Sequence, residues 1–220
     1  MSEEARRGDA EIERQGEPES VSAAPRRRVA ASPRRLFCAV ELPTELRARA
    51  AAHIAQLREK MPDARAGWER EEKLHLTLKF YGDVALPRTD ALSQAIERAA
   101  NRVKSFPLAI AEAGAFPLRG AARVLWLGVR DATGNLARLH QALEEECAAA
   151  EFPREPRPFH PHLTIARLRT PGGARTLAGL HRELGFAAME FAVNELVLMR
   201  SELGPKGSCY TALARHRLAV

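Results

Sequence analysis

The chain of 220 residues has no long apolar segment, few cysteines and only 5% aromatic residues. No stretch free of charged residues approaches the about 20 apolar positions of a membrane-spanning helix, so we expect no membrane span. The three cysteines, Cys38, Cys147 and Cys209, are odd in number and widely spaced. This argues against a disulfide framework or a cysteine-based zinc site and favours a reducing compartment. We therefore expect a cytoplasmic protein.

The rest of the composition is that of a globular protein with a basic charge balance. Hydrophobic residues make up 45% of the chain and charged residues 28%, with a formal net charge of +6. This length suffices for one domain, or two small lobes, around a proper core. The positive charge suggests an acidic partner such as nucleic acid, although an ordinary solvated surface would carry it too.

The first 34 residues differ from the remainder of the chain. Residues 1–19 contain seven acidic residues against three arginines, whereas residues 26–35 contain five arginines and no acid. Large apolar residues are almost absent, so this segment cannot bury enough surface to offset its ordering entropy. We expect residues 1–34 to form a disordered charged extension and residues 35–220 to form a two-lobed domain.

The predicted elements of this domain follow the same order twice. Each half predicts a strand, a helix, an alternating strand, a helix and a strand. The predicted ranges are 36–42, 45–60, 74–80, 88–103 and 106–113, then 123–130, 133–150, 162–166, 173–184 and 190–199, with a last strand at 209–214. Two β-α-β-α-β units predict an α+β fold with two sheets around a central cleft, related by a pseudo-twofold axis.

Each half carries the tetrapeptide His-Leu-Thr-apolar on its alternating strand. Successive side chains of a strand alternate between its faces, so His75 shares one face with Thr77, and His162 with Thr164. A single copy would be an ordinary solvated strand face. Two copies at matched positions predict that the pseudo-twofold axis brings both motifs together.

Basic residues near the motifs are further candidates. A regular strand places Lys79 on the His75 face. Arg167, five residues after His162, falls on the opposite face of a regular strand, at the point where that strand is expected to end. We take Arg167 as the main candidate for neutralising phosphate charge and Lys79 as a weaker one.

Aromatic residues near the motifs have mixed expected positions. We expect Phe80 and Trp126 in the core, on the apolar side of their strands. Tyr210 is predicted either to line the cleft, where it would stack on a base, or to occupy a core or edge position.

Two histidines in one cleft can supply an acid and a base. Because the ordinary pKa of histidine is about 6.5, one ring can be neutral and the other protonated near neutral pH. Each such group contributes roughly 10²–10⁴-fold to a rate, and threonine hydroxyls can donate to phosphate oxygens. This scheme needs no metal or cofactor. His160 and His162 resemble a metal-binding pair, but no carboxylate cluster completes a site there.

Several stretches resemble a known family: HLTLKFYGDV at 75–84, PHLTIAR at 161–167 and SELGPKGSCYTALAR at 201–215. LFCAVELP at 36–43, GAFP at 114–117 and RVLWLGV at 123–129 fit the same pattern. The chain resembles the RNA 2′,3′-cyclic phosphodiesterases, also called 2′-5′ RNA ligase-like proteins, of the two-histidine (2H) phosphoesterase superfamily. The resemblance covers about residues 35–220.

The resemblance implies a function and roles for the candidate residues. It implies metal-independent hydrolysis of RNA 2′,3′-cyclic phosphate ends to 2′-phosphomonoesters. His75 would be the proton donor to the departing 3′ oxygen, and His162 the proton acceptor that activates water. Thr77, Thr164 and Arg167 would bind the phosphate. The reverse reaction would join such an end to a 5′-hydroxyl through a 2′-5′ bond. The expected partners are RNA ends or nucleoside 2′,3′-cyclic phosphates, with a monomeric chain, no protein partner and no cofactor.

Two alternatives remain open at this point. One is a 2H phosphodiesterase that acts on another cyclic or 2′-5′ phosphodiester. The other is a non-catalytic RNA-binding module, which would explain the basic charge but not the two matched histidines. Substitution of either histidine separates catalysis from binding, and product analysis with several cyclic nucleotides separates the substrates.

Overall fold

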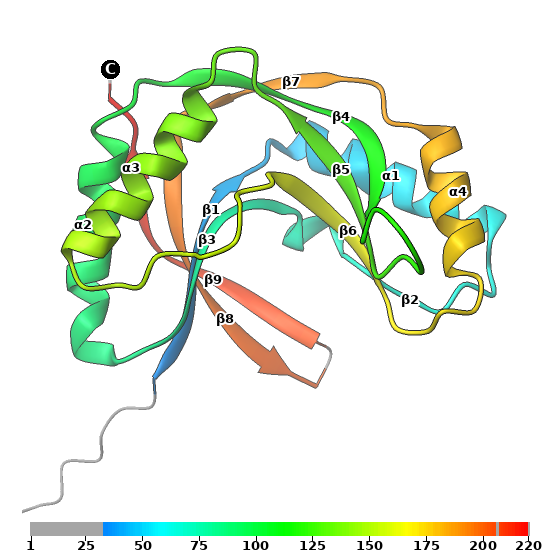
Figure 1. Cartoon of the computed structure of the whole chain (residues 1–220), viewed down its shortest axis with the longest axis horizontal. Coiled ribbons are helices and arrows are strands. Elements are labelled where there is room, and N and C mark those ends of the chain that lie inside the picture. The colour runs from blue at the N-terminus through cyan, green and yellow to red at the C-terminus, as the bar shows by residue number, and fades with distance from the viewer. Residues whose placement is uncertain (1–32, 206, 220) are drawn as a thin grey trace, which may run out of the picture. The chain divides into compact units, whose positions relative to one another are not determined.

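Two antiparallel sheets form the frame of the molecule, for which a computed structural model describes residues 33–205 and 207–219 (Figure 1). Sheet A has the strand order β3-β1-β8-β9, and sheet B has the order β2-β6-β5-β4-β7. The strands are β1 (Arg34–Glu41), β2 (Ala66–Trp68), β3 (His75–Val84), β4 (Phe106–Phe116), β5 (Val124–Arg130), β6 (His162–Leu168), β7 (Met189–Val193), β8 (Glu195–Gly204) and β9 (Gly207–Arg217). The predicted α+β fold with two sheets is thus confirmed.

Four helices cover the outer faces of these sheets: α1 (Thr44–Lys60), α2 (Thr89–Ala100), α3 (Asn135–Ala149) and α4 (Ala174–Leu184). Helices α2 and α3 lie over sheet A, and α1 and α4 lie over sheet B (Figure 1). Each sheet is therefore covered by one helix from each half of the chain. The apolar faces of all four helices join one continuous core, which explains why the two halves fold as a unit.

Two further expectations concern the N-terminal extension and membrane spans. The predicted extension at residues 1–34 lies outside the described residues, apart from its last two positions. Among the residues that the structure describes, no helix combines the length and the apolar character needed to cross a membrane.

The predicted strand at 190–199 is in fact two strands. β7 pairs with β4 in sheet B, whereas β8 pairs with β1 in sheet A, and Asn194 lies between them. The carbonyl oxygen of Asn194 accepts a hydrogen bond from Leu218 N at 2.8 Å. Buried apolar residues occur on both sides of Asn194, so the residue pattern does not reveal that the chain passes from one sheet to the other here.

Strands β3 and β6 lie against each other where the two sheets meet. Since His75 begins β3 and His162 begins β6, the two His-Leu-Thr motifs come from neighbouring strands of different sheets. This confirms the expectation that the duplicated fold brings the motifs together.

The same irregularity interrupts both of these strands three residues after the histidine. Leu78 in β3 has no partner across the ladder with β1, and Ile165 in β6 has none across the ladder with β5. Each is the extra residue of a β-bulge, which shifts the alternation of side chains by one position. Beyond the bulge, odd-numbered and even-numbered residues exchange faces.

The bulge in β3 overturns the predicted positions of Lys79 and Phe80. Lys79 points into the core, where it is only 3% exposed, and its ammonium donates to Glu144 Oε1 at 2.6 Å and to the carbonyl oxygen of Pro153 at 2.9 Å. Phe80 lies on the opposite face and is 58% exposed. Lys79 is therefore a structural residue that ties β3 to α3, and it is not part of the histidine face.

Candidate active site

Both motif histidines are held by the same hydrogen bond. Nδ1 of His75 lies 2.7 Å from the carbonyl oxygen of Lys73, and Nδ1 of His162 lies 2.7 Å from the carbonyl oxygen of His160. A carbonyl oxygen can only accept, so each Nδ1 carries the proton that it donates. Each neutral ring therefore keeps an unprotonated Nε2, the atom that can take a proton from a substrate or return one to it.

His160 takes part in the site through its backbone. This residue supplies its backbone carbonyl, and its side chain is exposed. Within residues 33–205 and 207–219, no three His, Cys, Asp or Glu side chains are grouped closely enough to hold a metal ion. The backbone carbonyl of His160 thus orients the ring of His162, and the side chain of His160 takes no part in this contact.

Aromatic rings pack against the histidines. The centroid of the His75 ring lies 5.0 Å from that of Phe37 and 5.1 Å from that of Tyr210. The Tyr210 ring is edge-on to the imidazole, with an angle of 83° between the ring planes. The His162 ring lies 5.2 Å from Phe116, edge-on at 85°. Tyr210 therefore lies beside His75 and, at the same time, on β9, the edge strand of sheet A, so it combines the cleft and edge positions predicted for it. These contacts restrict each imidazole to one orientation.

The environment of His75 lowers its pKa below the ordinary value of 6.5. Burial is the main cause, because it penalises the charged ring, and the positive charge of Arg167 acts in the same direction. The Lys73 carbonyl and the carboxylate of Glu41 oppose this shift. In the free protein His75 is therefore mainly neutral at neutral pH, and a bound anion would favour its protonated form.

The bulge at Ile165 brings Arg167 onto the face of His162 and Thr164. Its side chain is 62% exposed, and it lies close enough to the other sheet to affect the pKa of both His75 and Tyr210. Arg167 thus connects the two halves electrostatically. All five residues predicted for the site lie on the two strands that meet.

Glu69 is absent from the residues predicted for the site. It follows β2, its amide donates to the carbonyl of Ile165 at 2.9 Å, and its carboxylate lies 4.0 Å from Nε of Arg167. Burial raises its pKa, against the opposing effects of Arg167 and Lys73. The residue pattern does not predict the short strand β2, so it contains no indication that Glu69 lies beside Arg167.

Trp126 is not in the core, contrary to the prediction, but is half-buried on the same face as Thr164, its partner across the ladder. Its ring lies 5.2 Å from Phe116, the residue that contacts His162. A Cβ atom at Gly114 would lie 2.2 Å from this indole, so only glycine leaves room for it. The glycine of the GAFP stretch thus allows the packing that supports His162.

Two buried histidines support the same strand from the outer face of sheet B. Nε2 of His181 donates to the carbonyl of Trp126 at 3.0 Å, which leaves its Nδ1 to accept from Nε2 of His53 at 2.9 Å. His181 lies on α4 and His53 on α1, so this chain of hydrogen bonds joins both covering helices to β5. Burial lowers the pKa of both residues, and that of His53 to about 4.

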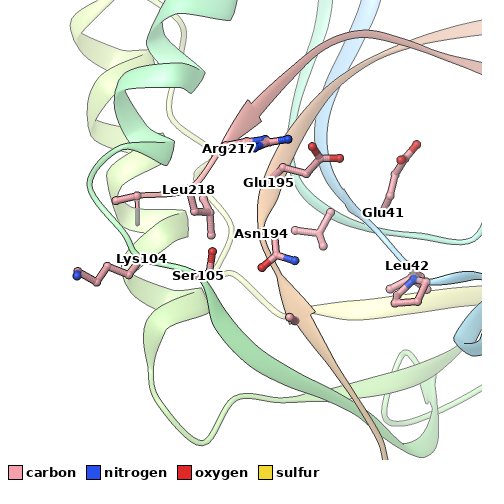
Figure 2. A pocket seen from close by; sticks show the side chains of 12 residues that line it. Glu41, Leu42, Lys104, Ser105, Asn194, Glu195, Arg217 and Leu218 are labelled. Atoms are coloured by element: carbon pink, nitrogen blue, oxygen red, sulfur yellow. The ribbon is translucent and has the colours of Figure 1, made fainter.

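A separate pocket of about 840 Å³ lies at the end of sheet A (Figure 2). Its polar lining includes Glu41, Asn194, Glu195 and Arg217, but neither motif histidine. Glu41 is the partner of His75 across the ladder, so the pocket borders the site without containing it. We place the candidate active site at the histidines, because the matched hydrogen bonds and the arginine converge there.

The fold and the site together define the class of protein. Two sheets each contribute a His-x-Thr motif from neighbouring strands, so one substrate could contact both histidines. A family model described as the 2′-5′ RNA ligase superfamily matches residues 43–205. The chain belongs to this superfamily.

Similar proteins with known names cover nearly the same part of the chain. The RNA 2′,3′-cyclic phosphodiesterase of Methanothermobacter thermautotrophicus is 34% identical over 187 residues, which are 84% of this chain and 98% of that protein. The RNA 2′,3′-cyclic phosphodiesterase of Escherichia coli is 34% identical over 184 residues, 84% of this chain and 96% of that protein.

Solved structures show the same architecture. The structure of E. coli LigT in complex with 3′-AMP superposes with a TM-score of 0.67 at 30% identity, covering 86% of this chain and 99% of that one. The TT0787 protein of Thermus thermophilus superposes with a TM-score of 0.67 at 28% identity, covering 84% and 97%. These similarities confirm the resemblance and the fold class predicted from the sequence.

Proposed function

We propose that the protein is an RNA 2′,3′-cyclic phosphodiesterase that hydrolyses 2′,3′-cyclic phosphate ends to 2′-phosphomonoesters. The observation that carries the proposal is the matched pair of histidines, each with Nδ1 bound to a backbone carbonyl and Nε2 left for the substrate. The named relatives are RNA 2′,3′-cyclic phosphodiesterases over most of the chain, and one solved relative binds the nucleotide 3′-AMP.

In the proposed reaction His162 and His75 act as base and acid. Nε2 of His162 removes a proton from a water molecule as the water oxygen forms a bond to phosphorus. The bond between phosphorus and the 3′ oxygen breaks, and Nε2 of protonated His75 gives its proton to that oxygen. The product has a 2′-phosphate and a free 3′-hydroxyl, and proton exchange with solvent restores both rings. Each histidine is expected to contribute about 10²–10⁴-fold to the rate.

The remaining site residues would bind the phosphate. The guanidinium of Arg167 offers several donors in one plane, a geometry that suits two phosphate oxygens at once. The hydroxyls of Thr77 and Thr164 would donate to non-bridging oxygens as negative charge develops on them. The anion would also raise the lowered pKa of His75 and so favour the protonated form that a donor requires.

Phe80 and Tyr210 offer aromatic surface to the base of a nucleotide. The buried ring of Phe37 contacts both, with its centroid 5.8 Å from that of Phe80 and 5.2 Å from that of Tyr210, on the side of the site that contains His75. Stacking of a base on an aromatic side chain stabilises binding by about 1–3 kcal/mol with little dependence on sequence. We propose this surface as the base platform. Attack by a 5′-hydroxyl in place of water, with the same departure of the 3′ oxygen, would join two ends through a 2′-5′ bond.

The test is hydrolysis of 2′,3′-cyclic AMP by three variants in the presence of EDTA. His75→Ala and His162→Ala are each expected to lower kcat/KM by about 10²–10⁴-fold. His160→Ala is the matched control, because it removes an imidazole two residues from His162 but keeps the carbonyl that holds it. We expect this control to retain activity close to that of the unmodified protein.

Other results would point to the alternatives. Full activity in His75→Ala or His162→Ala would refute the acid and base roles. Loss of activity in His160→Ala, together with inhibition of the unmodified protein by EDTA, would indicate a metal site instead. No turnover of any cyclic nucleotide, with RNA affinity retained, would favour an RNA-binding module.

A further inference from the structure

Glu69 is held on the histidine side of sheet B by its backbone. Gly67 pairs with Arg167 across the ladder between β2 and β6, and Glu69, two residues later, lies on the same side as Gly67. The amide of Glu69 donates to Ile165, the bulged residue of β6. This hydrogen bond does not involve the side chain, so its carboxylate can be altered without loss of the anchor.

The carboxylate contacts Arg167 at one edge only. Oε1 of Glu69 lies 4.0 Å from Nε of Arg167, and the arginine side chain remains 62% exposed while that of Glu69 is 22% exposed. The two terminal nitrogens of the guanidinium are thus left for another anion. A phosphate bound there would lie on the same cation as Glu69, within reach of its negative charge.

Glu69 also acts on the other half of the site. Burial raises the pKa of Tyr210, and the charge of Glu69 raises it further. Tyr210 in turn contacts the ring of His75. The charge of Glu69 therefore reaches the half of the site that contains His75.

We propose that Glu69 determines specificity for the charge of the bound phosphate, by weakening the binding of a dianionic phosphomonoester more than that of a monoanionic cyclic diester. The proposal rests on the proposed function. Hydrolysis turns a cyclic diester with one negative charge into a monoester whose second pKa is about 6, so the product carries a second charge above that pH. Repulsion by Glu69 then favours release of the product over retention.

The size of the effect follows from the contact distance. The 4.0 Å between Glu69 and Nε of Arg167, the width of the guanidinium and a charged hydrogen bond of about 2.8 Å to phosphate place the anion about 7–9 Å from the carboxylate. At this distance each added unit of charge changes affinity by about 2- to 50-fold, depending on the local dielectric constant. We take about tenfold as the expected difference between product and substrate.

The experiment compares Glu69→Gln with Glu69→Asp, which keeps the charge. We measure KM for 2′,3′-cyclic AMP, and the dissociation constant of 2′-AMP by calorimetry, at about pH 8, where the monoester is dianionic. In Glu69→Gln, we expect both KM for 2′,3′-cyclic AMP and the dissociation constant of 2′-AMP to fall. The dissociation constant is expected to fall by a factor about tenfold larger than that for KM. In Glu69→Asp their ratio stays near that of the unmodified protein. The difference shrinks at high ionic strength, because salt screens exposed charges.

Two results would overturn the role of Glu69. If Glu69→Gln changes both constants by the same factor, its charge does not discriminate between the two phosphates. If both constants rise, Glu69 serves only to position Arg167. Absence of hydrolysis by the unmodified protein would instead overturn the proposed function, while calorimetry with 2′-AMP would still report on Glu69.

Discussion

Replacement of Lys79 by methionine tests the bulge in β3 most severely. A regular strand would place this lysine beside His75, whereas the structure buries it against Glu144 at 2.6 Å. Removal of one partner of a buried ion pair costs about 3–5 kcal/mol, because the other charge stays buried without its counter-ion; Glu144 would keep only the Glu155 amide at 3.2 Å and the His140 ring at 3.8 Å. For a domain of this size each kcal/mol lowers Tm by about 2–4 °C, so we expect Lys79→Met to lower Tm by about 6–20 °C.

Activity distinguishes the two placements of Lys79. At a temperature where Lys79→Met is still folded, we expect kcat/KM for 2′,3′-cyclic AMP to stay within about twofold of the unmodified protein, because Lys79 makes no contact with the site. The double variant Lys79→Met/Glu144→Leu should recover most of the lost stability, since it removes both buried charges. A variant with unchanged Tm and greatly reduced kcat would refute the bulge and return Lys79 to the histidine face.

Three further predictions concern the support of the site. Gly114→Ala forces a Cβ into the indole of Trp126 and should lower the free energy of unfolding by about 1–3 kcal/mol and also lower kcat. Gly172→Ala is the control, because the space around Gly172 is open. Equal stability of the two variants would contradict this packing. Since the pKa of His53 is lowered to about 4, the unfolded chain binds more protons than the folded protein between about pH 4 and 6.5. His53 alone should therefore lower the free energy of unfolding by at most about 3 kcal/mol as the pH falls through this range, and His181, whose pKa is also lowered, adds to this fall, as urea denaturation would show. Arg167→Lys keeps the charge but loses the planar fork, so we expect KM for 2′,3′-cyclic AMP to rise about tenfold, and an unchanged KM would exclude paired contacts to the phosphate.

Most elements can be predicted from the sequence because their periodicity is strong. The pattern predicts a helix at 45–60, where α1 lies at Thr44–Lys60, and another at 173–184, where α4 lies at Ala174–Leu184. The duplicated motif also predicts that His75 and His162 meet, because two copies of one unit pack around a pseudo-twofold axis. These predictions depend on local patterning, which a single sequence contains.

The departures from prediction arise where pairing between strands decides the outcome. Nothing in the residues around Leu78 or Ile165 signals an unpaired position, yet these bulges bury Lys79, expose Phe80 and turn Arg167 toward its histidine. Glu69 escapes prediction because β2 has only three residues and is defined by its partner β6. Register is a property of two segments together, so one segment's sequence does not determine it.

The most direct test of the account is product analysis after incubation with an RNA that ends in a 2′,3′-cyclic phosphate, with EDTA present. Attack of water with departure of the 3′ oxygen predicts only the 2′-phosphomonoester, formed by the unmodified protein and by His160→Ala but not by His75→Ala or His162→Ala. Formation of the 3′-phosphomonoester, or of a product in the histidine variants at the unmodified rate, would contradict the assignment of His75 and His162 as acid and base.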